Sequence, residues 1–257
     1  MAGNDRKLVI LQDRDMHLLR ELAVMRVIDR EQAKVVAGFH STTRVNARLL
    51  ALTQAGFLRR FFWGSVGSAR KALYSLSPRG AEIVGVPDRG PRRRRDQVLA
   101  ADFFSIHQLQ VNELYCTLKY RPLPNGAKFV RWVSFQEPIA GTALIPDGYA
   151  EVGIAGKFLA VFFEVDLGTE NRAAWQRKVQ PYLSYAASGG FTREFHQPQF
   201  RTLVVTTSES RLTSLRVATA ALTDKIFRFT TGERIKREGF WGNIWQRPTG
   251  NERQTLL

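Results

Sequence analysis

Apolar residues in the N-terminal third of the chain change from helical to strand spacing. Two segments within residues 11–37, and a third over residues 42–54, repeat apolar positions every three or four residues, which predicts amphipathic helices. Residues 57–63 and 71–76 are rich in aromatic and aliphatic side chains and predict two strands joined by a turn. A short helix is expected to begin at Ser77-Pro78.

Three helices followed by a two-stranded ribbon form a winged helix-turn-helix, which we expect over residues 1–85. The third helix of such a domain lies in the major groove of DNA, where Arg reads guanine and Asn reads adenine. The residues that we expect to face DNA lie on this helix and on the wing: Thr42, Thr43, Arg44, Asn46, Arg48, Arg70 and Lys71. The alternative is a winged helix that contacts protein and leaves these charges in solvent.

Residues 86–95, with the sequence VPDRGPRRRR, form a predicted linker. Two prolines and a glycine disfavour a helix, and a block of like charges either stays solvated or binds phosphate. Both roles stay open for the four consecutive arginines, which we include among the candidate DNA contacts: Arg92, Arg93, Arg94 and Arg95.

Residues 96–257 mix long helices with apolar strands and are expected to form a second domain. We expect helices over residues 96–120 and 209–223, and strands at residues 129–135, 158–165 and 199–206. This mixture predicts an α/β domain around a central mixed sheet, so the whole chain is of the α+β class. The aromatic segment at residues 240–245 either packs against the core of this domain or stacks on bases.

Three acidic residues gather around one predicted hairpin. Asp147 precedes its first strand, Ala155-Gly156-Lys157 form its turn, and Glu164 and Asp166 lie at the end of its second strand. An unpaired buried carboxylate costs several kcal/mol, so these acids indicate a site. Hairpin pairing is expected to bring Asp147 and Glu164 to the same end of the sheet, and Lys178 follows on the next helix.

The order Asp, Glu-x-acid and Lys is typical of metal-dependent nucleases. Mg²⁺ or Mn²⁺ prefers oxygen ligands, which Asp147 and Glu164 would supply, with Glu113 of the preceding helix as a further metal ligand. The candidate catalytic residues are Asp147, Glu164, Asp166 and Lys178. Such sites usually carry a lysine two residues after the Glu; Asp166 stands there, so we expect Lys178 to replace it in space. The alternative is a structural salt-bridge cluster on a nuclease-like scaffold.

Composition adds a polyanionic partner to this picture. The net charge of the 257 residues is +15, and residues 1–95 hold 19 Lys and Arg against 8 Asp and Glu, which indicates nucleic acid. Cys116 is the single cysteine, so a disulfide within the chain and a thiolate zinc site are excluded, in keeping with a reducing cytoplasm. Neither a signal peptide nor a membrane span is expected, because the apolar runs are only strand-sized.

Several motifs in the same order resemble the replication-relaxation family of plasmid and mobile-element proteins. They are QDRDMHLLRELAVMRVIDREQ, RLLALTQAGFLRR, YSLSPRGAEI, HQLQVNEL, IPDGYAEV, FFEVDLGTEN, RKVQPYL and LVVTTSESR. The resemblance covers roughly residues 10–220. It implies a winged helix, a domain similar to the PD-(D/E)xK nucleases, and a role in plasmid replication or mobilisation.

Two functions are compatible with these observations. The first is a protein that binds double-stranded DNA and has a Mg²⁺- or Mn²⁺-dependent nuclease or nickase centre. The second is a non-catalytic DNA-binding replication or transcription regulator. In that case the second domain would mediate homodimerisation or contacts with other replication or relaxosome proteins. Convergence of Asp147, Glu164 and Lys178 favours the first function, and an arginine bound to Asp166 favours the second.

Overall fold

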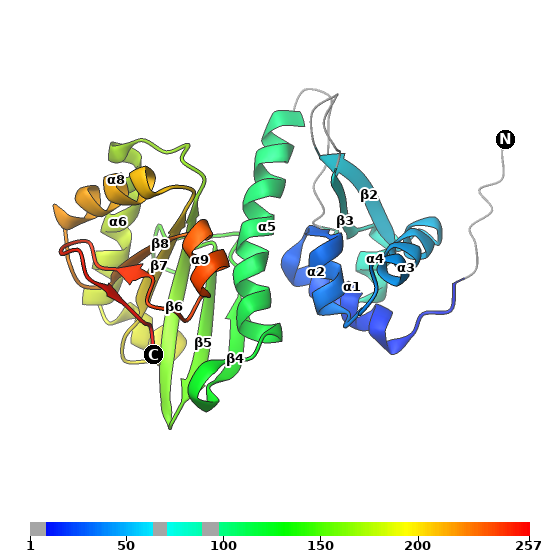
Figure 1. Cartoon of the computed structure of the whole chain (residues 1–257), viewed down its shortest axis with the longest axis horizontal. Helices are drawn as coiled ribbons and strands as arrows, with labels where there is room; N and C mark the ends of the chain where they lie inside the picture. The colour runs from blue at the N-terminus through cyan, green and yellow to red at the C-terminus, as the bar shows by residue number, and fades with distance from the viewer. Residues whose placement is uncertain (1–8, 64–70, 89–97) are drawn as a thin grey trace. The chain divides into compact units, whose positions relative to one another are not determined.

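The computed structural model describes residues 9–63, 71–88 and 98–257, with side chains from residue 104 onward in the last range (Figure 1). The chain divides into two compact units, Met1–Tyr120 and Arg121–Leu257. Across the described ranges, no helix combines the length and the apolar content that a membrane crossing requires.

The first unit combines helices with a small antiparallel sheet. Its elements are α1 (Asp13–Met25), β1 (Ile28–Asp29), α2 (Arg30–Val36), α3 (Thr42–Gln54), β2 (Leu58–Trp63), β3 (Lys71–Leu76), α4 (Pro78–Ile83) and α5 (Val98–Tyr120). The strands pair in the order β1-β3-β2. Side-chain caps begin α2 and α4, since Gln32 N–H donates to Asp29 at 2.8 Å and Gly80 N–H donates to Ser77 at 3.0 Å. The helix and the strand predicted at residues 42–54 and 71–76 are confirmed.

Helix α5 belongs to the first unit, whereas the sequence pattern assigned it to a domain beginning at residue 96. Polar side chains explain the difference. Gln32 Nε2 donates to the carbonyl of Leu109 at 2.8 Å, Asn112 Nδ2 donates to the carbonyl of Val27 at 2.5 Å, and the Tyr115 hydroxyl donates to Glu21 at 2.6 Å. Apolar spacing alone predicted the helix but not the surface that covers it. Most of the predicted linker, including Arg92–Arg95, lies outside the described residues.

The second unit is built on a mixed sheet. Its elements are a 3₁₀ turn (Pro124–Gly126), β4 (Lys128–Val133), β5 (Gly148–Ile154), β6 (Lys157–Asp166), α6 (Arg172–Ala187), α7 (Gly190–Phe195), β7 (Arg201–Thr206), α8 (Glu209–Ala220), β8 (Phe227–Thr231), α9 (Gly232–Glu238), β9 (Trp245–Gln246) and β10 (Arg253–Gln254). The strand order is β10-β9-β8-β7-β6-β5-β4. Strands β6, β7 and β8 are parallel and their neighbours pair antiparallel, which confirms the predicted α+β class and mixed sheet.

An aromatic core lies between this sheet and helices α6, α7 and α8. Figure 1 shows α6 and α8 side by side along the sheet. Phe162 of β6 is fully buried at its centre, with ring contacts to Tyr182 of α6, Phe191 of α7 and Phe200. The C-terminal aromatic segment also packs inward, because Trp245 is fully buried and its indole N–H donates to the carbonyl of Phe240 at 2.9 Å. Phe240 and Trp245 therefore pack inside the domain rather than lie exposed for stacking on bases.

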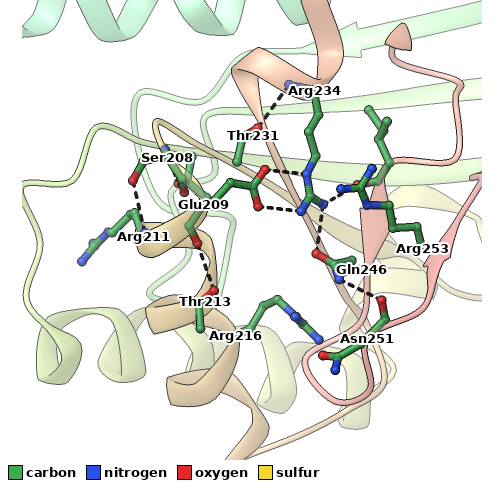
Figure 2. A network of polar contacts seen from close by, with 12 residues as sticks. Ser208, Glu209, Arg211, Thr213, Arg216, Thr231, Arg234, Gln246, Asn251 and Arg253 are labelled. Atoms are coloured by element: carbon green, nitrogen blue, oxygen red, sulfur yellow. Dashed lines mark hydrogen bonds and ion pairs between the residues drawn. The ribbon is translucent and has the colours of Figure 1, made fainter. Parts of the chain in front are cut away.

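A polar network holds the end of the second unit together (Figure 2). Arg234 of α9 donates to both carboxylate oxygens of Glu209, at 2.7 and 2.6 Å, and to Gln246 of β9 at 2.9 Å. Arg216 of α8 donates from Nε to the carbonyl of Arg247 at 2.7 Å. The network thus fixes β9, and the backbone of Arg247 just after it, against α8 and α9.

Candidate functional site

The β5–β6 hairpin places Asp147 beside Glu164. Its two-residue turn, Ala155-Gly156, has φ values of 47° and 76°, the positive values that suit a tight hairpin. This turn sets the register, which pairs Gly148 with Phe163. Asp147 N–H then donates to the carbonyl of Phe163 at 3.1 Å, and Val165 N–H donates to Asp147 Oδ2 at 2.6 Å.

Gly148 allows a tryptophan to lie against the hairpin next to Asp147. A Cβ at Gly148 would lie 2.3 Å from a ring carbon of Trp132, which is too close for any side chain. The Trp132 ring stacks on Phe163 at 5.3 Å between centroids. The position following Asp147 is therefore restricted to glycine while Trp132 keeps this place.

Glu164 points toward helix α6 because side chains alternate along a strand. Phe162 and Glu164 share one face of β6, and Phe162 lies in the core beneath α6. The Tyr182 hydroxyl donates to Glu164 Oε1 at 2.6 Å, and Lys178 Nζ lies 2.9 Å from Oε2. This second contact is an ion pair. Lys178 and Tyr182 are four residues apart and so reach the strand from one helix face.

Charges within this cluster act strongly on one another. Burial raises the pKa of Glu164 to about 7, opposed by Lys178 and assisted by the charge of Asp147. Burial works against the charge of Lys178, but Glu164 and Asp147 outweigh it and raise the pKa of Lys178. Burial and Glu164 also raise the pKa of Tyr182 well above its ordinary range. Asp147, Glu164, Lys178 and Tyr182 therefore form one electrostatic cluster, which we call the Glu164 cluster.

Asp166 does not join the Glu164 cluster, although the sequence made it a candidate catalytic residue. Arg211 of α8 holds it with two hydrogen bonds, at 2.6 and 2.7 Å, and Gly168 N–H donates to it at 3.1 Å. The side chain of Asp166 is 4% exposed. A bidentate arginine at a buried carboxylate neutralises its charge, so Asp166 is tied into the fold.

Among the described residues, no three His, Cys, Asp or Glu side chains gather closely enough to hold a metal ion. Lys178 lies against the Glu164 oxygen that a cation would need, and Asp147 Oδ2 already accepts a backbone N–H. Glu113 lies on α5, in the other unit. The Mg²⁺ or Mn²⁺ site at Asp147 and Glu164 that the motif order predicted stays a prediction.

In the first unit, α3 presents the exposed side chains that the sequence predicted. Thr42, Thr43, Arg44 and Asn46 are all exposed, while Val45 and Leu49 are buried behind them. Arg44 has no side-chain partner within the described part of the chain. The helix therefore offers a polar face on which Arg44, near the N-terminal end, is free of partners among the described residues.

Two predicted DNA contacts are instead engaged within the first unit. Arg48 forms an ion pair with Asp15, which is 1% exposed, and also donates to the carbonyl of Ile10 at 2.8 Å. Lys71 Nζ lies 2.5 Å from Asp29, although 47% of the lysine side chain stays exposed. Arg70 falls outside the described residues.

Sequence reasoning predicted Lys178 as the cation near Glu164 but missed two other side chains that bind the acids. Tyr182 and Arg211 are 18 and 45 positions away from the carboxylates that they bind. The four-residue spacing of Lys178 and Tyr182 was a usable signal for a shared face, whereas Arg211 carries no local signal for its role.

Comparison with known families decides the identity. The model of the replication-relaxation family matches residues 19–196, well over half of the sequence. The chain belongs to the replication-relaxation family. The match runs from within α1 to the end of α7, and so includes both α3 and the Glu164 cluster.

Other comparisons with this replication-relaxation protein are sparse. No curated protein matches it. The solved structure of restriction endonuclease FokI is similar over 90% of this chain and 47% of that one, with 11% sequence identity and a TM-score of 0.30. This chain thus spans about half the length of the solved structure that it matches, and a likeness at that TM-score carries no argument.

Proposed function

We propose that this replication-relaxation protein binds double-stranded DNA through its first unit, in the replication or mobilisation of a plasmid or mobile element. In this proposal the first unit is a winged helix-turn-helix and α3 is its recognition helix. The observation that carries the proposal is the exposed polar face of α3, where Arg44 is free of side-chain partners among the described residues. The family membership and the positive charge of the chain support it.

A groove beside α3 supports the same proposal. A cavity of about 260 Å³ is lined by Asn46 of α3, Arg30 and Glu31 of α2, and Lys71 and Tyr74 of β3. Asn46 thus borders a groove with two cations, of which Arg30 pairs with Glu31 at 2.8 Å and Lys71 with Asp29 at 2.5 Å. Arginine and lysine neutralise phosphate, while an asparagine contact to adenine adds sequence preference.

The test is the affinity of the full chain for duplex DNA as salt is varied. Arg44→Ala should weaken binding by about 1–3 kcal/mol, or roughly ten- to hundredfold, and flatten the salt dependence. Arg20→Ala is a matched control, because it removes the same charge from an exposed position on α1. An Arg44→Ala protein that is folded and binds DNA like the control would disprove the proposal. Arg48 is left unchanged because it holds Asp15.

We infer that the second unit acts without catalysis, as a dimerisation surface or a contact for other replication or relaxosome proteins. The support is that each buried acid at this end of the sheet has its own partner, Lys178 for Glu164 and Arg211 for Asp166. The oligomeric state measured by analytical ultracentrifugation, with and without DNA, tests the dimer. A protein that stays monomeric at all concentrations leaves only the contact with other proteins.

One observation favours a second candidate, a metal-dependent nuclease or nickase. Asp147, Glu164 and Lys178 come together at one end of a hairpin, in the order that the motif predicted. Incubation with supercoiled plasmid tests it, in Mg²⁺, in Mn²⁺ and in chelator, with Asp147→Asn as the control. Cleavage that needs the metal and Asp147 would establish this candidate. Intact plasmid, together with no heat on titration of Mn²⁺, would exclude it.

A further inference from the structure

A second group of charges lies at the opposite end of the strands from the Glu164 cluster. Strands β6, β7 and β8 are parallel, and a cavity of about 570 Å³ opens where they begin. The cationic residues that line it are Lys157, Arg201, Lys225, Arg228 and Arg247. The sheet register explains the gathering, because Arg201 begins β7, Arg228 lies near the start of β8, and Arg247 follows β9. We call this cavity the arginine pocket.

The side chains that line the arginine pocket include no carboxylate among the described residues, although Leu257, the last residue of the printed chain, also lines it. Arg201 donates to the carbonyl of Leu256 at 3.1 Å, and Arg228 donates to the carbonyls of Lys225 and Phe227 at 2.6 and 2.7 Å. Asp224 acts on Arg228 from outside the pocket lining, and its effect on the pKa of Arg228 is smaller than those of Arg201 and Arg247. The guanidinium groups of Arg201 and Arg228 are therefore held by neutral carbonyl groups and repelled by neighbouring arginines.

Arg228 carries the strongest sign of a missing partner. Its side chain is 5% exposed, and its Nε finds no hydrogen-bond acceptor among the described residues. Burial, with the charges of Arg201 and Arg247, lowers its pKa to about 10. A buried donor without an acceptor is rare in folded proteins and calls for an explanation. This Nε has almost no exposed surface, so an anion in the pocket would act on Arg228 by offsetting the repulsion from Arg201 and Arg247.

The shape and chemistry of the arginine pocket narrow the class of anion. Guanidinium groups form paired hydrogen bonds with phosphate oxygens, and three arginines from three places in the sheet would surround such a group. Apolar residues also line the cavity, among them Ile154, Ile226 and Phe158. The Phe158 ring is 53% exposed, and an exposed aromatic ring can stack on a base.

We propose that the arginine pocket binds a nucleoside phosphate, with its phosphate held by Arg201, Arg228 and Arg247 and its base against Phe158. The source is either a free nucleotide or the terminal phosphate of a DNA strand, which share this chemistry. The site goes beyond the proposed function, because it uses residues of the second unit alone and does not depend on α3.

Calorimetric titration of the full chain tests the site with deoxyadenosine monophosphate, deoxyadenosine and inorganic phosphate. The monophosphate should bind once per chain, phosphate more weakly, and deoxyadenosine not measurably. Arg247→Gln and Arg201→Gln should each weaken binding of the monophosphate roughly tenfold or more. Lys236→Gln, an exposed cation of α9 outside the pocket, should bind like the wild type. Phe158→Ala should weaken binding of the monophosphate but not that of phosphate.

Two DNA hairpins that differ only in a 5′-phosphate or a 5′-hydroxyl distinguish the sources. Tighter binding of the phosphorylated hairpin, lost in Arg247→Gln, identifies a DNA end, while equal binding of both hairpins identifies a free nucleotide. Arg44→Ala separates this site from the proposed DNA contact, because it should leave binding of the monophosphate unchanged. The proposal fails if the wild type gives no heat with the monophosphate, or if a folded Arg247→Gln protein, altered at an exposed side chain, binds it like Lys236→Gln.

Discussion

The two ends of strands β6, β7 and β8 differ in how their charged side chains are paired. Where β6 ends, each buried acid has a cation of its own, since Lys178 lies against Glu164 and Arg211 against Asp166. Where the same strands begin, Arg201 and Arg228 share a cavity with further cations and are held by carbonyl groups. A charge that is matched inside the fold stabilises the fold, whereas an unmatched charge is available to a ligand. The arginine pocket, which no sequence motif marks, is thus the better candidate for binding a ligand.

The largest effect is expected from removing the cation of the matched end. Lys178→Met would leave Glu164 and Asp147 facing each other without a counter-charge, and Glu164 is fully buried. Breaking a buried pair costs roughly 3–5 kcal/mol, and we expect the lower part of this range because 36% of the Lys178 side chain is exposed. Urea unfolding at pH 8 measures the loss.

The double variant Glu164→Gln with Lys178→Met is the control for this measurement. It removes the unpaired carboxylate of Glu164 together with the charge of Lys178, so most of the lost stability should return. A Lys178→Met protein as stable as the wild type at pH 8 would contradict the matched-charge description. The same variant should lose less at pH 5, where Glu164 is protonated in the folded state.

The second expected effect is a dependence of stability on pH that belongs to Glu164. Its pKa is raised from 4.5 to about 7 on folding, so the folded protein holds this proton more tightly than the unfolded chain. The resulting stabilisation is complete below pH 4.5 and is lost as the pH rises through about 7. Relative to Glu164→Gln, the wild type should lose on the order of 3 kcal/mol across this window.

Parallel unfolding curves of wild type and Glu164→Gln between pH 4 and 8 measure this difference. The glutamine keeps an acceptor for the Tyr182 hydroxyl, so the comparison isolates the charge. Identical pH profiles for the two proteins would show that Glu164 is not desolvated as its position in the sheet indicates.

The third prediction separates Asp166 from a catalytic role. Arg211→Met removes both charge-assisted hydrogen bonds from a carboxylate whose side chain is 4% exposed, and should destabilise the second unit by roughly 1.5–3 kcal/mol. Arg211→Lys keeps the positive charge but not the paired N–H donors of the guanidinium. Its free energy of unfolding should therefore lie between those of the wild type and Arg211→Met. Unfolding in guanidinium chloride, followed by tryptophan fluorescence, ranks the three proteins by their free energy of unfolding. An Arg211→Met protein of unchanged stability would reopen the catalytic interpretation of Asp166.

How far the sequence predicted this site depends on the distance over which each contact acts. The pairing of Asp147 with Glu164 was predictable, because a two-residue turn and the alternation of a buried strand fix the register. The partner of Asp166 was not, since Arg211 lies 45 positions away and only the packing of α8 brings it there. The arginine pocket was missed for the same reason. Arg201, Arg228 and Arg247 are scattered in sequence and meet through strand order alone.

The fold shows the same division between local and distant information. The helix at residues 42–54 was predicted to the residue because Ser41 and Gly56 mark its ends. The short helices α7 and α9 were missed, since each is a turn or two long and shows no apolar repeat. The position of α5 in the first unit depended on buried polar contacts, such as that of Asn112 with Val27, which periodicity does not record.

The smallest expected effect is at the unmatched end, and its sign is the informative part. Arg247→Gln removes one of several cations that repel one another, and its own side chain is exposed. The change in stability should therefore stay within about 0.5 kcal/mol, with a slight gain at low salt that disappears as salt screens the repulsion. Thermal unfolding at two salt concentrations measures it, with Lys236→Gln as the control outside the pocket. A loss as large as that of Arg211→Met would mean that Arg247 is matched by a partner in the fold, and the contrast between the two ends would no longer hold. Arg247→Gln is expected to be slightly more stable than the wild type at low salt. If added phosphate stabilises the wild type and removes this difference, the free charges at this end are balanced by an anion.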